Sequence, residues 1–322
     1  MPVASAPARA LVRPRKTWPR RLSSIDSFEE KSSSGSSRYS QLVSVVTGDG
    51  SDLTLISVQR WDDDAVHLAQ HDALVGRDAH YKHLAVSLGG AVVRVNANVR
   101  YAGPGGEADL LGVYFADAGQ HLEHRLFVDH NAPKTRSNVD YKGALQGQGA
   151  HSVWVGDVLI RKVAEGIETY ESNRNLVLTD GCQADSVPNL EIETGEIEGA
   201  GHASTTGRFD DEQLFYLQSR GIHEDEARRL VVHGFFNDII RRIGVREIEE
   251  ELRSTVEDDA DRALLGQVGQ GAGPHRWLSS ASMASTSRSC RAGTPICCRT
   301  SVKKPSTTIR RASSAGMPRD CR

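Results

Sequence analysis

Short runs of apolar and β-branched residues follow one another through the middle of the chain. They are separated by Gly, Asn, Asp or Pro, which favour turns, and apolar and polar positions alternate within many of them. Almost no helical period interrupts the runs. This pattern predicts β-strands at 53–58, 83–88, 91–101, 110–116, 121–130, 137–143, 151–160, 168–180 and 189–194.

Two architectures fit such a succession of short strands. One is an antiparallel sandwich or barrel, and the other is a parallel solenoid in which each turn of the chain stacks on the previous one. Asparagines recur where corners are predicted, at Asn96, Asn98, Asn173 and Asn175. Because Asn tolerates left-handed backbone and can form ladders between stacked turns, this distribution favours the solenoid.

The period changes after the predicted strands. Asp210 can accept hydrogen bonds from the free amides of a first helical turn while Gln213 reaches back, and Gly221 suits the end of that helix. A second helix begins at Glu224, and residues 247–265 extend the pattern with a weaker apolar face. The apolar positions of the second helix recur at steps of three and four residues: Ala227, Leu230, Val231, Phe235, Ile239 and Ile243.

Both ends of the chain differ from this centre in composition. Residues 1–44 and 267–322 are rich in Ser and Arg without a repeating apolar face. They are predicted to be disordered, or to derive from a shifted reading frame. The sequence therefore divides into a β core at 45–208 and a helical segment at 209–266, between two atypical ends.

Charge follows the same division. Residues 1–24 hold six Lys and Arg and no acid, residues 267–322 hold ten and one acid, and residues 25–266 carry a net charge of −18. Clustered basic residues can neutralise nucleic-acid phosphates, but neither end has the pattern of a folded binding module. The acidic centre would repel a polyanion, so no nucleic-acid partner is expected.

Cysteine usage argues against a secreted or zinc-binding protein. Only Cys182 lies in the β core, and no CxxC pair occurs. No stretch approaches the roughly 18 apolar residues of a membrane helix, and no signal-peptide core follows the basic N-terminus. A cytoplasmic protein without a membrane partner is therefore expected.

Candidate catalytic motifs are sparse. Neither a phosphate-binding loop nor a GxSxG motif occurs, which argues against nucleotide binding and against a serine hydrolase. His121, His124 and His130 suggest a cupin-like metal-binding β-barrel, although odd and even spacings place side chains on opposite strand faces. A β-helix enzyme acting on carbohydrates is another alternative, but the four Trp of the chain are few for a sugar-binding groove.

Four segments carry a resemblance to a known family. They are 186–222 (SVPNLEIETGEIEGAGHASTTGRFDDEQLFYLQSRGI), 226–240 (EARRLVVHGFFNDII), 117–145 and 171–192. Together they resemble the SufB/SufD family of iron-sulfur cluster assembly proteins, specifically its actinobacterial SufD branch. The resemblance extends over about residues 45–250.

The resemblance implies a mainly β protein, a right-handed parallel β-helix with a C-terminal helical segment. It implies a non-catalytic scaffold subunit that pairs with a SufB-like subunit and docks a SufC-like ABC-type ATPase. On such a complex an iron-sulfur cluster is built transiently with sulfur from a donor system, and the partner ATPase binds ATP. No cofactor is then expected to be bound stably by this chain alone.

The resemblance also assigns an interface residue. His202 matches the SufD histidine that lies at the SufB/SufD interface and is implicated in cluster formation, and a neutral imidazole there can bind iron. The alternative role for His202 is a hydrogen bond across the interface. Some relatives carry a Cys where this chain has Ala200, which removes one possible ligand.

Cys182 precedes His202 by twenty residues, about one turn of a solenoid with 20-residue repeats, so the two side chains are expected to stack. A thiolate at Cys182 can accept persulfide sulfur or bind iron, and the alternative is a small buried side chain. The helical block resembles the family's surface for the ATPase. This assigns docking to Phe215, Phe235, Phe236 and Ile239, which equally fit a plain core.

Overall fold

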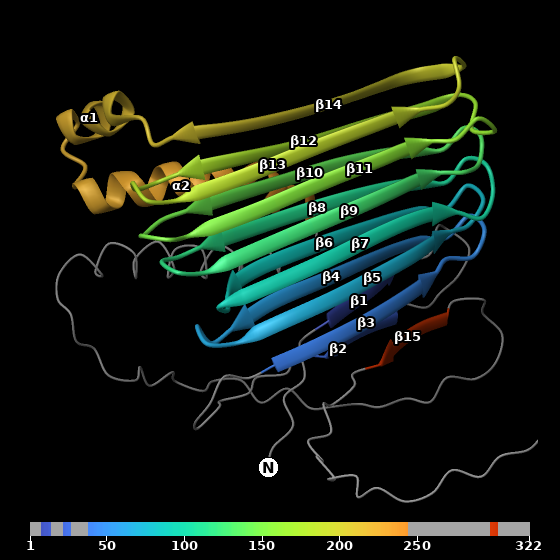
Figure 1. The fold of residues 1–322 in the computed structure, drawn as a ribbon, viewed down its shortest axis with the longest axis horizontal. Coiled ribbons are helices and arrows are strands. Elements are labelled where there is room, and N and C mark those ends of the chain that lie inside the picture. The colour runs from blue at the N-terminus through green and yellow to red at the C-terminus, as the bar shows by residue number, and fades with distance from the viewer. Residues whose placement is uncertain (1–7, 14–21, 27–37, 244–296, 302–322) are drawn as a thin grey trace, which may run out of the picture.

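The chain folds as a parallel β-solenoid of about six turns followed by two helices (Figure 1). The computed structural model describes residues 8–13, 22–26, 38–243 and 297–301. The even sheet contains β4 (Asp52–Trp61), β6 (His80–Gly89), β8 (Glu107–Ala116), β10 (Arg136–Leu145), β12 (Ile167–Val177) and β14 (Ile197–Arg208). The odd sheet contains β3 (Arg38–Val46), β5 (Val66–Val75), β7 (Val92–Tyr101), β9 (His121–His130), β11 (His151–Ile160) and β13 (Gln183–Ile192).

Neighbouring coils pair in parallel, which confirms the predicted solenoid and excludes the antiparallel alternative for this core. Each coil contains two strands of about ten residues and two turns. Residues that stack are 26 to 32 positions apart, as in the series Asp52, His80, Glu107, Arg136 and Glu168.

Short strands extend the first coil. β1 (Ala8–Arg13) pairs antiparallel with β4 and with β2 (Leu22–Asp26), and β15 (Cys297–Ser301) pairs antiparallel with β3. These strands lie in segments predicted to be disordered, and β3 begins before the predicted boundary at 45, so the structure differs from the sequence prediction there. An open sheet edge accepts added strands with little regard to side-chain pattern, which periodicity does not reveal. The remaining residues of both ends lie outside the described ranges.

The asparagines lie within strands, so the prediction that they mark corners is wrong. Asn96 and Asn98 donate to Gln70 Oε1 at 3.1 Å and to Asp72 Oδ1 at 2.8 Å, one coil away, so the predicted ladder does form. Glycine takes most left-handed corner positions, for example Gly105 with φ of +73°.

The two helices are α1 (Asp211–Ser219) and α2 (Glu224–Ile243), as the sequence predicts. The Asp210 side chain accepts a hydrogen bond from the Glu212 amide at 2.9 Å, and Gly221 has a φ of +84° after the last turn of α1. The predicted extension through 247–265 lies outside the described residues.

Helix α2 covers the outer face of the even sheet over β8 and β10. The later parts of β8 and β10 are consequently buried on both faces, which explains their near-continuous burial. Asp140 of β10 stabilises this contact, because its carboxylate accepts a hydrogen bond from Arg242 of α2 at 2.9 Å. It also accepts one from Ser172 of β12 at 2.9 Å. The α2 side chains in this second core are Val232, Phe236, Ile239 and Ile240.

Two tyrosines fill the space above two glycines in adjacent coils. Gly112 of β8 pairs with Tyr141 of β10, and Gly143 of β10 pairs with Tyr114 of β8. A Cβ atom on either glycine would overlap the neighbouring ring, and both rings are fully buried. Each large side chain therefore requires the absence of a side chain beside it.

We expect Gly143→Ala to lower the free energy of unfolding by about 3 kcal/mol, because the buried Tyr114 ring has no space into which to move. Urea denaturation of the full chain measures this change. Gly207→Ala is the matched control, since a Cβ atom on that β14 glycine meets no atom within 4 Å. Equal stability of the two variants would contradict the packing explanation.

Candidate functional site

The last coil, β13 and β14, forms an open end of the solenoid. These strands are the terminal members of the odd and even sheets, and no strand in the described part of the chain pairs with their outer edges. Most of their residues are exposed or half-buried, unlike those of the preceding coils. Ile192, for example, points inward beside the fully buried Ile160 but is itself exposed. The open end therefore presents inward-facing side chains that no further coil of the described chain covers.

His202 lies at this open end, in the middle of β14. It stands opposite Glu171 of β12, one coil earlier. The His202 side chain is 46% exposed and the Glu171 side chain is 1% exposed, with His202 Nδ1 3.9 Å from Glu171 Oε1. The pair thus joins a buried carboxylate to an accessible imidazole.

Glu171 lacks hydrogen bonds, and sequence reasoning did not identify it. Neither carboxylate oxygen has a hydrogen-bond partner within the described ranges. Burial, helped by the nearby charge of Asp157, raises the pKa of Glu171 to about 8. Gly156 of β11 leaves the space that the carboxylate occupies, because a Cβ atom there would overlap it.

Other inward-facing polar residues of β12 are fully engaged. Thr169 Oγ1 lies 2.6 Å from Ser137 Oγ, and Asn173 Nδ2 donates to the Tyr114 hydroxyl at 2.9 Å. Asn175 Nδ2 donates to Asn173 Oδ1 at 2.8 Å. The lack of bonds at Glu171 is therefore a local feature of that position. Alternation of inward and outward positions along β12 is enough to place Glu171 on the inner face. Placing it beside His202 also requires the length of a coil, which the sequence did not reveal.

Cys182 does not stack on His202, so that prediction is wrong. The true repeat is about 30 residues, and Glu171 occupies the position one coil before His202. Cys182 lies in the turn before β13, half-buried against the inner core, and its thiol donates to the Gly147 carbonyl at 3.4 Å.

The four aromatic and aliphatic residues assigned to docking divide into two groups. Phe236 and Ile239 are fully buried against the even sheet, so their assignment to a partner surface requires correction. The same helical period describes core and partner faces, which is why the sequence did not separate them. Phe215 of α1 is 72% exposed, and Phe235 is half-buried beside the second core.

The histidines of the cupin-like alternative do not converge. His124 and His130 are buried between the sheets, where His130 contacts Thr135 and Ser137 at 2.7 and 3.0 Å. His121 lies on the outer face of the odd sheet. Within the described residues, no three or more His, Cys, Asp or Glu side chains gather in a metal-binding arrangement. Neither the fold nor this geometry supports that alternative.

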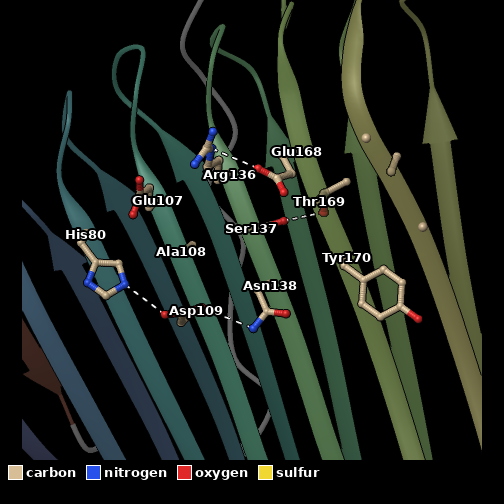
Figure 2. Close-up of a pocket in the computed structure, with 13 residues that line it drawn as sticks. His80, Glu107, Ala108, Asp109, Arg136, Ser137, Asn138, Glu168, Thr169 and Tyr170 are labelled. Carbon is tan, nitrogen blue, oxygen red and sulfur yellow. Dashed lines mark hydrogen bonds and ion pairs between the residues drawn. The ribbon is translucent and has the colours of Figure 1, made fainter. Parts of the chain in front are cut away.

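A shallow groove of about 500 Å³ crosses the starts of the even strands on their outer face (Figure 2). His80 Nε2 lies 3.1 Å from Asp109, Asn138 donates to the same carboxylate at 3.4 Å, and Arg136 pairs with Glu168 at 3.3 Å. The hydrogen bond to Asp109 raises the pKa of His80. The charged groups of this groove therefore form bridges between coils.

The raised pKa of Glu171 predicts that the free energy of unfolding depends on pH. Between pH 4.5 and about 8 the folded chain holds a proton that the unfolded chain releases, so stability falls as the pH rises. We expect Glu171→Gln to remove this slope, and its stability relative to the parent should grow by up to about 1.4 kcal/mol per pH unit in that window. Urea denaturation across the pH range measures the difference. Glu168→Gln, on the exposed face of β12, should give a flat difference, and a flat result for Glu171→Gln would contradict the raised pKa of Glu171.

None of the helices in the described ranges combines the length and apolar character that crossing a bilayer requires.

Comparisons with known proteins identify the family of this chain. Residues 20–235 match the family model of the SUF system FeS cluster assembly, SufBD core domain. The chain is 60% identical over 233 residues to an iron-sulfur cluster assembly SufBD family protein of Mycobacterium bovis, covering 70% of this chain and 59% of that protein. It is 27% identical over 204 residues to the Escherichia coli iron-sulfur cluster assembly protein SufD, covering 63% of this chain and 45% of that protein.

A Mycobacterium leprae protein of the same family is 59% identical over 231 residues. The match covers 70% of this chain and 59% of that protein, so the chain spans about three fifths of the length of these mycobacterial relatives. The family model covers well over half of the chain. The chain therefore belongs to the SufBD family of the SUF system of iron-sulfur cluster assembly.

Proposed function

We propose that this chain is a SufD-type, non-catalytic scaffold subunit of a cytoplasmic SUF complex. It pairs with a SufB-like subunit and docks a SufC-like ATPase, which binds the ATP. A sulfur-donor system supplies the complex, and the iron-sulfur cluster is its transient product. Family membership and the likeness to the Escherichia coli SufD protein support this assignment.

The observation that carries the proposal is the open end. Two sheets end together there, no described strand pairs with their outer edges, and inward-facing side chains such as Ile192 are exposed. A strand edge of this kind pairs readily with another strand, and a second solenoid offers two such strands at the matching spacing. The SufB-like subunit would then continue both sheets and bury the open end.

His202 is the proposed iron-binding side chain of this interface. Its imidazole is accessible from the open end, so pairing would place it between the two subunits. A neutral imidazole is a ligand for iron, and iron atoms of a growing cluster would be its cargo. Cys182 is half-buried with its thiol bonded to a carbonyl on this chain, so we assign it a packing role.

The helices supply a second contact. Phe215, Tyr216 and Leu230 are exposed large side chains on α1 and α2, while α2 remains fixed to the even sheet through its buried face. An apolar surface on a firmly held helix pair suits a protein partner. We assign this surface to the SufC-like ATPase.

We expect Ile192→Asp to reduce recovery of a co-expressed SufB-like subunit by about tenfold, because a charge would be buried where two coils meet. Affinity purification on this chain with quantification of the partner measures the loss. Leu68→Asp is the control, since Leu68 of β5 is similarly exposed on the same sheet but remote from the open end. Unchanged recovery with Ile192→Asp would refute pairing through the open end.

A charged side chain on α1 should weaken binding of the SufC-like ATPase. Phe215→Asp is expected to lower co-purification of the SufC-like ATPase by about tenfold and to leave the SufB-like subunit bound. Val163→Asp serves as the control because Val163 is comparably exposed in the turn between β11 and β12. Full retention of the ATPase by Phe215→Asp would remove α1 from the docking surface.

A further inference from the structure

The buried carboxylate of Glu171 requires an explanation that the fold itself does not provide. A buried charged group without hydrogen bonds is destabilising, and native proteins keep such groups where an ion, a water molecule or a partner satisfies them. Thr169 and Asn173, its neighbours on the same inner face of β12, are hydrogen-bonded within the chain. Glu171 is therefore an exception on a strand that otherwise satisfies its polar groups.

The surroundings of Glu171 preserve this exception. Gly156 lies beside the carboxylate, and any side chain at that position would occupy its space. Asp157, the next residue, adds a second negative charge nearby and makes an anionic Glu171 harder to keep. The charge of Asp157 disfavours a bare anion at Glu171, and a cation that reaches the carboxylate from the open end would offset that cost.

The distance to His202 fits one ion held between the two side chains. Oxygen and nitrogen ligands lie about 2.0–2.2 Å from a divalent first-row metal ion, so two ligands on opposite sides of one ion are at most about 4.4 Å apart. Glu171 Oε1 and His202 Nδ1 are 3.9 Å apart, too far for a hydrogen bond and within that limit. One side chain is anchored in the core and the other is accessible, which gives the ion both a fixed ligand and an entry path.

We propose that Glu171 and His202 together bind one divalent transition-metal ion at the open end of the solenoid. Carboxylate oxygen and imidazole nitrogen suit iron(II), and the choice of iron over other metals rests on the proposed function. Water and groups of the pairing subunit complete the coordination, which is consistent with the lack of a three-ligand group among the described side chains. Glu171 is thus the counter-charge that holds the ion beside the interface imidazole.

Cobalt(II) titration of the isolated full-length chain tests this proposal, because its visible absorption reports nitrogen and oxygen coordination directly. The parent chain should bind one cobalt ion at pH 8, and both Glu171→Gln and His202→Ala should weaken binding at least about tenfold. Glu168→Gln, an exposed carboxylate of the same strand, should bind as the parent does. The melting temperature should rise with cobalt for the parent and for Glu168→Gln alone.

Absence of cobalt binding by the parent, or parent-like binding by Glu171→Gln, would overturn the proposal. If Glu171→Gln fails to fold, Glu171→Asp decides, because the shorter side chain keeps the charge but withdraws the oxygen from the ion; unchanged binding by a folded Glu171→Asp would overturn it equally. The measurement uses this chain without partners. A failure of subunit pairing therefore leaves the result intact, and the two proposals are judged separately.

Discussion

The fixed register between consecutive coils is the constraint on which the rest of this structure depends. Parallel backbone hydrogen bonds join each strand to the strand one coil earlier, and turns of two to six residues connect the strands from β3 to β14. Side chains one coil apart consequently meet in columns, such as Asn98 on Asp72 and His202 beside Glu171. Packing, polar ladders and the candidate site are all consequences of this alignment.

The sequence predicted the architecture because the strand runs and turn residues recur along the chain, and because the helix signals after Asp210 are local. It did not predict the coil length, since a repeat of about 30 residues has no matching sequence repeat here. This single gap explains why Cys182 was placed beside His202 and why Glu171 was overlooked. The helix period was likewise ambiguous, because Phe236 and Ile239 satisfy both a core and a docking face.

The interior of the solenoid combines apolar packing with buried polar groups, several of which are hydrogen-bonded to one another. Tyr114 of β8 shares hydrogen bonds with Asn173 and Asn175 of β12, two coils further along the solenoid, and the ring of His130 contacts two hydroxyl groups. The open end differs, because its inward-facing residues are exposed and the Glu171 carboxylate has no hydrogen-bond partner among the described residues. Burial is lowest in the coil where the chain meets its proposed partner.

Asp140 joins α2 to the strand that carries Glu171. One of its oxygens accepts from Arg242 near the end of the helix, and the other accepts from Ser172, the residue next to Glu171. A displacement of α2 would therefore be transmitted to β12 through these two hydrogen bonds, and not only through the chain that connects the strands to the helix. The carboxylate of Asp140 therefore couples helix α2 to two neighbouring strands of the even sheet, β10 and β12.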